Sequence, residues 1–496
     1  MEARNLTQTA KFDNELHSVL DDAKVNPKDC YQCGKCSAGC PVVSDADMTP
    51  REVLRHLQLG QVEPVLKSNM PWLCAGCGMC LARCPQSVDL PNLMLACRRA
   101  AEAQGIKPIG EIARFNQLFV NGVREKGLSD EAVLAMRFNL TTGHFLQDAL
   151  SAPKMVVRGM IGPTSKEQAN ADEVKELIDR ARMAASQNTP SPRKGGIAMM
   201  YAYFPGCSAY STGISYTNSY NYVALAAGIE LAEIPNWNCC GASAAHAESD
   251  LLGDALPARS LALSEEAFGH APVLAPCAGC YLHLKTATAH AQENDEVRIQ
   301  LEHIIDRPWS ASAYVANGLE PFLPAEAQER LAQRVCLPLD GLKVACYYGC
   351  ALLRPTEVCN FDDDEQPHTM EDLVALSGAS PIEWNFKNEC CGASHQISVP
   401  KTGRTMIRRI LENAAANGAD AIACACPLCM LNLDMREAEI NAARAKEGLP
   451  PLDIPIYYFT ELLAASMGAP ASKSGINRHF HPAGNLHMAS SSNFSR

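Results

Sequence analysis

The stretch Cys239-Cys240-Gly241-Ala242-Ser243 occurs a second time as Cys390-Cys391-Gly392-Ala393-Ser394. Each copy lies within a longer cysteine pattern, C-x31-CC-x36-C-x2-C for the first and C-x39-CC-x34-C-x2-C for the second. A long pattern repeated with nearly equal gaps indicates an internal duplication. The first unit contains Cys207, Cys239, Cys240, Cys277 and Cys280, and the second contains Cys350, Cys390, Cys391, Cys426 and Cys429. The sequence therefore predicts two homologous units that each build a thiolate-rich site.

The composition favours metal binding over disulfide bonding. The chain of 496 residues contains 23 cysteines and carries a net charge of −12. The first twenty residues show no secretory signal, and no apolar run reaches the ~18 residues needed to span a membrane. Cysteines in this number inside a reducing compartment indicate metal ligands, and the acidic charge argues against a nucleic-acid partner. We therefore expect a cytoplasmic protein without a transmembrane segment, which would reach the inner face of a membrane only through partners.

Two further cysteine runs precede the duplication. Cys30–Pro41 and Cys74–Pro85 both match C-x2-C-x2-C-x3-C-P, the pattern of two-cluster bacterial ferredoxins. In that pattern three thiolates of a run hold one [4Fe-4S] cluster and the fourth serves the other cluster. One cubane cluster is therefore expected on Cys30, Cys33, Cys36 and Cys84, and the other on Cys74, Cys77, Cys80 and Cys40. A pair of zinc sites is the alternative, but two runs with Cys-Pro terminators leave little room for it.

Capping and periodicity predict helices around these runs. Thr49-Pro50-Arg51-Glu52 is a capping box that begins a helix ending near Gly60. A second helix is expected from about residue 91 to 105, and helical patterns continue to about residue 185. The segment 186–197, which is rich in proline, glycine and polar residues, is predicted to be a linker.

Beyond the linker, short apolar runs end at cysteines and alternate with helical stretches. The runs that lead to single cysteines lie at 199–204, 273–275, 344–345 and 421–423, and those that precede the Cys-Cys pairs lie at 229–234 and 382–386. This alternation predicts parallel βαβ units, in which sites lie at the carboxyl ends of the strands. The predicted fold is a multidomain α+β protein: a helical ferredoxin-like domain with two [4Fe-4S] clusters, followed by two duplicated α/β domains.

The predicted domain organisation follows from these patterns. We expect an N-terminal arm at 1–27, the helical domain at 28–185, the linker at 186–197, the first Cys-Cys-Gly domain at 198–335, the second at 336–470 and a disordered tail at 471–496. The tail is polar with little apolar content. Its histidines, His479, His481 and His487, are therefore expected to lie in solvent.

These motifs resemble those of heterodisulfide reductase. Residues 28–185 resemble its C-type subunit, which has two cubane clusters, and residues 198–468 resemble its B-type subunit, which has two Cys-Cys-Gly domains, so the chain looks like a fusion of the two. The resemblance implies that each five-cysteine set binds a non-cubane [4Fe-4S] cluster and that the two clusters cleave a disulfide between them. It also implies a hetero-oligomer with a flavin-containing partner like the family's A-type subunit, and a small-molecule or protein-bound disulfide or thiol substrate.

The chemistry of the motifs predicts an oxidoreductase that acts on sulfur groups. Disulfide reduction takes two electrons and two protons, and soft iron sites suit the two released sulfurs. A bare Cys-x-x-Cys redox pair, as in thioredoxin, explains neither the Cys-Cys doublets nor the duplication. The ten cysteines of the two Cys-Cys-Gly units are thus the catalytic candidates. The sequence contains no G-x-G-x-x-G and no P-loop, so we expect no flavin or nicotinamide in this chain.

An alternative function keeps the clusters but removes the disulfide chemistry. Iron–sulfur subunits of glycolate, lactate and anaerobic glycerol-3-phosphate dehydrogenases also join ferredoxin motifs to Cys-Cys-Gly domains, and they pass electrons to quinone. The long helical segment after Cys97 and the two complete five-cysteine sets favour the reductase. Succinate and thiol:fumarate reductase iron–sulfur subunits are disfavoured, because no plant-type [2Fe-2S] spacing precedes Cys30.

Several residues near the motifs have no assigned role. The cysteines outside the motifs are Cys97, Cys336, Cys346, Cys359 and Cys424. Cys97 on a helix face, and Cys346 and Cys424 on apolar runs, are expected to lie in the core. The alternatives are a ligand role for Cys97 and a substitute-ligand or redox role for Cys346 and Cys424. His246 and His395 follow the Cys-Cys-Gly loops, and structural hydrogen bonding is preferred for them over proton donation. Arg354 is a candidate for steering an anionic substrate.

The metal content follows from the eighteen cysteines of the four motifs. Anaerobically purified protein is expected to hold about sixteen iron atoms per chain, because four clusters contain four irons each. Elemental analysis measures this directly. About eight irons with zinc in the remainder would contradict the Cys-Cys-Gly assignment.

Overall fold

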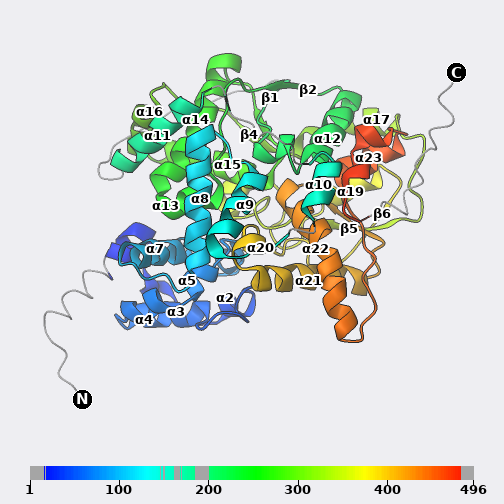
Figure 1. Ribbon diagram of the computed structural model, residues 1–496. Helices are drawn as coiled ribbons and strands as arrows, with labels where there is room; N and C mark the ends of the chain where they lie inside the picture. The colour runs from blue at the N-terminus through cyan, green and yellow to red at the C-terminus, as the bar shows by residue number, and fades with distance from the viewer. Residues whose placement is uncertain are drawn as a thin grey trace, which may run out of the picture.

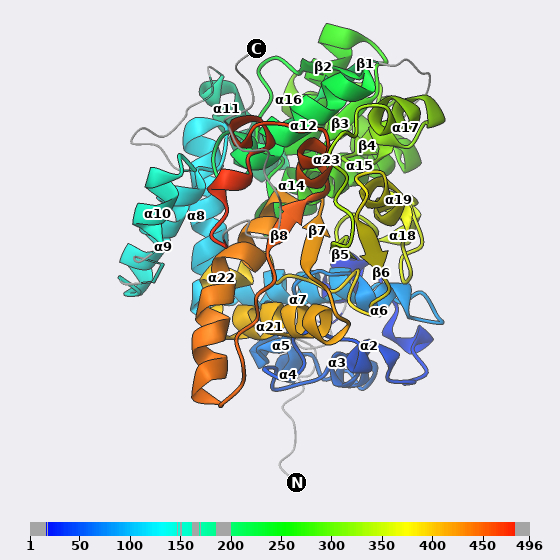
Figure 2. The ribbon, with the colours of Figure 1, turned by 90° about the vertical axis from the view of Figure 1, so that its right-hand side faces the viewer.

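The computed structural model describes residues 16, 18–145, 147, 148, 151–160, 168, 170–184 and 200–481. The predicted linker and His487 lie outside these residues. A group of short N-terminal helices lies against two units that each contain a sheet (Figures 1 and 2). In the described part of the chain, no helix combines the length and the apolar character that crossing a bilayer requires.

Short helices surround the two ferredoxin-type cysteine runs. They are η1 (Pro27–Asp29), α2 (Lys35–Ala38), α3 (Pro50–Gln58), α4 (Val62–Lys67), α5 (Met70–Leu73), α6 (Met79–Ala82) and α7 (Leu90–Ala103). The predicted capping box begins α3: the Glu52 amide donates to Thr49 Oγ1 at 3.3 Å, and the Thr49 amide donates to Glu52 Oε2 at 2.8 Å. The predicted arm is partly helical, since residues 18–23 are in helix and bury Val19 and Ala23 in the core of this group.

Four further helices lie between this group and the first sheet in the sequence. They are α8 (Gly110–Lys126), α9 (Glu131–Thr142), α10 (Ala152–Val157) and α11 (Ala171–Ala184). Helix α8 runs from the N-terminal group toward the first sheet (Figure 1). Val123 of α8 and Leu177 of α11 are buried in the core that contains the sheets, whereas Ile112 belongs to the core of the short helices. A third, smaller core is formed by Phe115, Leu118, Leu134 and Phe138 of α8 and α9. Residues 28–185, predicted as one helical domain, therefore divide among three cores.

The first sheet has four parallel strands, in the order β2-β1-β3-β4. The strands are β1 (Met200–Tyr203), β2 (Glu230–Glu233), β3 (Val273–Ala275) and β4 (Val315–Asn317). Its helices are η2 (Cys207–Tyr210), α12 (Ile214–Ala227), α13 (Ala242–Glu248), α14 (Asp250–Phe268), α15 (Ala278–Glu293), α16 (Asp295–Ile305), η3 (Glu320–Phe322) and α17 (Ala325–Ala332).

The second sheet repeats this topology with the order β6-β5-β7-β8, again all parallel. The strands are β5 (Lys343–Tyr347), β6 (Ser380–Ile382), β7 (Ala421–Cys424) and β8 (Ile456–Tyr458). Its helices are α18 (Thr356–Cys359), α19 (Thr369–Ala375), α20 (His395–Ser398), α21 (Pro400–Ala416), α22 (Pro427–Lys446) and α23 (Phe459–Ser466). The common strand order establishes the duplication, and the predicted α+β fold class is confirmed.

Residues 471–481 contradict the prediction of a disordered tail, and the rest of that tail lies outside the described residues. Residues 471–481 form α24 (Ala471–Ser474), η4 (Ile476–Arg478) and a short stretch that packs on α22 and α23. His479 is 5 % exposed, and its Nε2 lies 2.9 Å from Glu461 Oε1. His481 Nδ1 lies 2.5 Å from Glu437 Oε2, and its amide donates to Asp434. The polar composition of this segment predicted disorder, but its histidines pair with buried carboxylates and so hold the segment against the protein.

This C-terminal segment is expected to loosen as the pH rises. Burial lowers the pKa of His479, but Glu461 and Asp434 outweigh this effect and raise it above 6.5; the pKa of His481 is raised by its bond to Glu437 and by Asp453 and Asp434. A raised pKa in the folded state stabilises the segment fully below pH 6.5, and this stabilisation is lost as the pH rises through the folded-state value. Hydrogen-exchange protection factors of residues 471–481 should fall over this range.

The matched variants are H479Q, which removes the titrating group, and H303Q, which changes an exposed histidine on α16. H479Q should weaken protection at low pH and flatten its pH dependence, while H303Q should behave as the wild type. Protection that stays constant with pH in the wild type would contradict the role of these pairs.

Candidate metal centres

One cavity in the N-terminal helices is lined by the thiols of Cys40, Cys74, Cys77 and Cys80. Apolar side chains complete its wall, among them Val42, Met70, Met79, Leu90 and Met94. The cavity thus takes three cysteines from the second run and the last cysteine from the first run, which is the grouping that the ferredoxin pattern predicts.

A second cavity is lined by Cys30, Cys33, Cys36 and Cys84, together with Leu54, Val88 and Leu90. Cys80 also lines this cavity, so the two cavities adjoin. Cys33 is exposed, whereas the other seven cysteines of the two runs are partly buried. The Cys30 cavity is therefore the one that lies nearer the surface.

The donors in these cavities suit iron–sulfur clusters. Backbone amides point at the sulfurs: Gln32 N–H donates to Cys30 Sγ at 3.4 Å, and Val88 N–H donates to Cys84 Sγ at 3.3 Å. Burial raises the pKa of Cys40 and of Cys77 to about 12. Thiolates in so apolar a cavity require a cationic partner, and four thiolates with amide donors are the ligand set of a [4Fe-4S] cluster.

The first Cys-Cys-Gly unit gathers its thiols at the carboxyl ends of β1, β2 and β3. Cys240 Sγ lies 3.5 Å from Cys280 Sγ, and the Cys239 thiol is hydrogen-bonded to that of Cys207. Cys277 is in turn hydrogen-bonded to Cys280. The structure thus brings all five predicted residues of this unit together.

The second unit gathers its thiols in the same way beyond β5, β6 and β7. Cys391 Sγ lies 3.5 Å from Cys429 Sγ, and Cys350 is hydrogen-bonded to Cys390. Cys426 is hydrogen-bonded to Cys429. All five predicted residues of this unit are therefore also neighbours.

Both units place a glycine directly before their first cysteine, and the reason is steric. Gly206 and Gly349 have φ values of 76° and 70°. A Cβ at Gly206 would lie 3.0 Å from Cys280 Sγ, and a Cβ at Gly349 would lie 3.2 Å from Cys429 Sγ. The turn that carries the first thiol therefore passes so close to the last thiol that a side chain would crowd the sulfur, and the positive φ adds backbone strain for any residue other than glycine.

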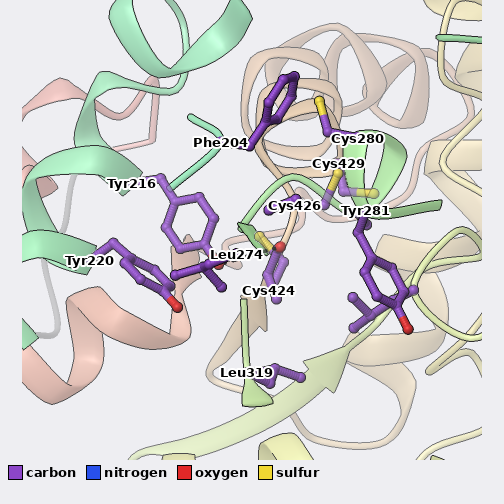
Figure 3. Packing of buried hydrophobic residues seen from close by; sticks show 14 of the residues in the cluster. Phe204, Tyr216, Tyr220, Leu274, Cys280, Tyr281, Leu319, Cys424, Cys426 and Cys429 are labelled. Carbon is purple, nitrogen blue, oxygen red and sulfur yellow. Dashed lines mark hydrogen bonds between the residues drawn. The ribbon is translucent and has the colours of Figure 1, made fainter. Parts of the chain in front are cut away.

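The two five-cysteine sites face each other. Cys277 of the first unit is hydrogen-bonded to Cys426 of the second. Figure 3 shows Cys280, Cys426 and Cys429 in one packed group, with the rings of Tyr216 and Tyr281 on either side. The Tyr216 hydroxyl donates to the carbonyl of Ala425 at 3.4 Å. The carboxyl ends of the two sheets thus converge on one buried region.

The second unit also adjoins the cavity of Cys40, Cys74, Cys77 and Cys80. Cys390 is buried in the core of the N-terminal helices, and Cys350 packs against that core. His395 Nε2–H donates to the carbonyl of Leu73, directly before Cys74, at 2.8 Å. Burial lowers the pKa of His395 to about 4. This histidine is therefore a neutral structural donor, as expected from the sequence.

The remaining cysteines do not join these sites. Cys97, Cys346, Cys359 and Cys424 are fully buried, and Cys336 is exposed. The predicted core positions of Cys97, Cys346 and Cys424 are thus confirmed.

His246 stacks on His283 with ring centroids 4.9 Å apart, a contact that the sequence did not indicate.

Arg354 is 2 % exposed and donates hydrogen bonds to Met79 and Asn388, so its side chain lies inside the protein and not on the outer surface.

Three further residues near the thiols are not identified by any sequence pattern. The Asn432 amide donates to Cys391 Sγ at 3.5 Å, Arg98 donates to the Cys74 carbonyl at 2.9 Å, and Glu131 accepts from Ser208, next to Cys207. Glu131 and Arg98 are far from their partners in sequence, so no local pattern identifies them.

The sites define an iron–sulfur protein with a dicluster domain and two cysteine-rich domains. A 4Fe-4S dicluster domain matches residues 29–89, and a Cysteine-rich domain matches residues 201–285 and 344–434.

The similar proteins include a subunit of a fumarate reductase and subunits of heterodisulfide reductases. The 8-methylmenaquinol:fumarate reductase membrane anchor subunit of Wolinella succinogenes is 30% identical over 283 residues, which are 56% of this chain and 96% of that protein. The B-type subunit of the ferredoxin:CoB-CoM heterodisulfide reductase of Methanosarcina mazei is 27% identical over 51% of this chain and 83% of that protein. The C-type iron–sulfur subunit of the CoB–CoM heterodisulfide reductase of Methanopyrus kandleri is 40% identical over 26% of this chain and 69% of that protein. The chain belongs to the family of heterodisulfide reductase iron–sulfur subunits. Its N-terminal region is similar to the C-type subunit, and the region with the two cysteine-rich domains is similar to the B-type subunit.

The cavity lined by Cys40 predicts a specific defect. C40S should damage the cluster of Cys74, Cys77 and Cys80, and the iron content should fall by up to about four atoms per chain. Electron paramagnetic resonance of the reduced protein distinguishes the two cubane signals. C97S, which changes a buried cysteine outside the cavities, is the control and should keep both signals. Selective loss of the cluster of Cys30, Cys33 and Cys36 in C40S would refute the crossed arrangement.

Proposed function

We propose that this chain is the iron–sulfur subunit of a heterodisulfide-type reductase, in which electrons enter at the dicluster domain and cleave a disulfide between the two Cys-Cys-Gly sites, or form one in the reverse direction. The observation that supports this most strongly is the contact between Cys277 and Cys426. It joins two complete five-cysteine sites face to face, which is the arrangement needed to act on both sulfurs of one disulfide.

The proposal assigns four clusters to the eighteen cysteines. Two cubane [4Fe-4S] clusters would be held by Cys30, Cys33, Cys36 and Cys84, and by Cys74, Cys77, Cys80 and Cys40; two non-cubane clusters would be held by Cys207, Cys239, Cys240, Cys277 and Cys280, and by Cys350, Cys390, Cys391, Cys426 and Cys429. When bound, such clusters supply single electrons and iron atoms that accept thiolate sulfur.

The proposed reaction breaks one S–S bond and makes two S–H bonds: R–S–S–R′ + 2 e⁻ + 2 H⁺ gives R–SH + R′–SH. The two electrons come one at a time from a low-potential one-electron donor, and the protons come from water. The chain's own residues keep the region apolar and ordered. Phe204, Tyr216 and Tyr281 are buried around the facing thiols, and the Asn432 amide donates to Cys391 Sγ.

The proposed partner is a flavoprotein. Cubane clusters exchange single electrons, whereas the sequence carries no dinucleotide-binding fingerprint that would let it take a hydride. A flavin-containing partner that converts two-electron to one-electron transfer would complete the reductase. We also propose that this chain lies in the cytoplasm, because a reducing compartment keeps so many cysteines as thiols.

A second candidate function is electron transfer to or from a quinone. The similarity to the membrane anchor subunit of 8-methylmenaquinol:fumarate reductase favours it, because that similarity spans nearly the whole of that protein. In this function the Cys-Cys-Gly sites would relay electrons without binding a disulfide. The iron–sulfur proteins of glycolate-, lactate- and glycerol-3-phosphate-type dehydrogenases belong to the same functional class.

Paired substitutions in the anaerobic full chain test the proposal. With reduced methyl viologen as donor, C239S/C240S and C390S/C391S should each lower disulfide reduction at least about a hundredfold, since each removes two of five iron ligands. Both cubane signals should persist. C336S, at an exposed cysteine, is the control and should retain full activity. Wild-type turnover in either double variant would exclude the Cys-Cys-Gly sites as the point of reduction. A wild-type chain that oxidises or reduces a menaquinone analogue but no disulfide would support the quinone function instead.

A further inference from the structure

Arg354 links the two kinds of cluster site. Its Nη1 donates to Met79 Sδ at 3.1 Å, and its Nη2 donates to the carbonyl of Asn388. Met79 lies between Cys77 and Cys80 of the dicluster domain, and Asn388 lies two residues before Cys390 of the second Cys-Cys-Gly unit. Its charge acts on the thiols of both Cys77 and Cys350. The guanidinium therefore lies between the two sites.

The charge of Arg354 has no carboxylate partner among the residues that the structure describes, and its Nε has no hydrogen-bond partner. Other arginines with as little exposure are neutralised: Arg259 pairs with Glu173 at 2.6 Å, and Arg436 pairs with Asp148. A buried cation without a counter-charge strongly destabilises the folded state. The thiolates on either side of Arg354 are the groups that can offset this cost.

The packing leaves little freedom for the Arg354 side chain. Gly78 follows Cys77 with a φ of 70°, and a Cβ there would lie 3.0 Å from Arg354 Cβ. The Arg354 amide donates to the Cys350 carbonyl at 3.1 Å. Both ends of the residue are thus fixed to cysteine loops.

The first Cys-Cys-Gly site has the opposite charge beside it. Glu131, at the start of α9, accepts hydrogen bonds from Ser208 at 2.6 Å, from Ser211 at 3.3 Å and from Thr212. These hydroxyls lie in the turn that follows Cys207. A carboxylate thus lies beside the first site, while a guanidinium lies beside the second.

We propose that Arg354 is a positioning residue that makes the second Cys-Cys-Gly site the more easily reduced of the two, so that electrons from the dicluster domain reach it first, while Glu131 disfavours electrons on the first site. This inference rests on the proposed function. In the step concerned, one electron would pass from the cluster that Cys40, Cys74, Cys77 and Cys80 would hold, which would be oxidised, to the cluster that the second site would hold, which would be reduced. A fixed positive charge in a low dielectric stabilises the added electron, and a negative charge opposes it. The electron originates from a low-potential one-electron donor.

Anaerobic redox titration of the full chain, followed by electron paramagnetic resonance, tests this inference. The second-site signal is the one that C390S/C391S removes, and the first-site signal is the one that C239S/C240S removes. R354M should lower the equilibrium constant for reduction of the second site about tenfold, a negative shift of about 59 mV for a one-electron couple. R354K keeps the charge without the planar fork, and should remain near the wild-type potential. E131Q should shift the first-site potential in the positive direction.

The matched control is R83M. Arg83 also connects the dicluster domain to the second unit, through two 2.8 Å contacts with Glu365, but it is neutralised and partly exposed. R83M should leave both potentials unchanged.

Equal shifts in R354M and R354K, or no shift in R354M with full iron content, would overturn the electrostatic role. If R354M loses iron, the R354K variant provides the test. A wild-type potential of the second site in R354K supports the inference, and a shifted potential overturns it. A wild-type chain that lacks the Cys-Cys-Gly signals would overturn the proposed function itself.

Discussion

The structure depends on one constraint. Ten thiols, carried by the loops that follow the strands of two sheets, must meet in a single buried region. Parallel strands meet this constraint because their carboxyl ends lie at one edge of the sheet, and the identical strand orders bring both sets of loops to equivalent places. The hydrogen bond between Cys277 and Cys426 then joins the two edges. Gly206 and Gly349 are consequences of the same crowding, since each lies against a thiol of its own unit.

The dicluster domain extends this arrangement in one direction. The cavity of Cys40, Cys74, Cys77 and Cys80 adjoins the second unit through Cys390, His395 and Arg354. The cavity of Cys30, Cys33, Cys36 and Cys84 contains the exposed Cys33. The cysteine sites therefore form a series from a surface position to the two facing units. The cavity of Cys40, Cys74, Cys77 and Cys80 adjoins the cysteines of the second unit, whereas the first unit meets the N-terminal helices through the ion pair of Arg99 with Asp250. The two halves of the duplication, although alike in topology, therefore have different neighbours and different charges beside their cysteines.

The sequence predicted what depends on local spacing. The capping box of Thr49 and Glu52 correctly indicated α3, and the apolar runs before the cysteines indicated β1, β2, β3, β5 and β7. The run predicted at 382–386 was placed too late, because β6 ends at Ile382. The sequence did not predict β4 and β8, which are followed by no cysteine, or the packing of α8 and α11 on the first sheet. The C-terminal histidines were misjudged because their partners, Glu461 and Glu437, are distant along the chain. Arg354 was noticed, but only the fold reveals that it is buried between two sites.

An anomalous iron map of anaerobically grown crystals tests the central claim most directly, because it locates the metal independently of activity. Four groups of iron density are expected. Two should lie in the cavities of the dicluster domain and one among the five cysteines of each Cys-Cys-Gly unit, and the last two should be adjacent across Cys277 and Cys426. Iron confined to the dicluster domain, or single zinc ions in the Cys-Cys-Gly units, would contradict it.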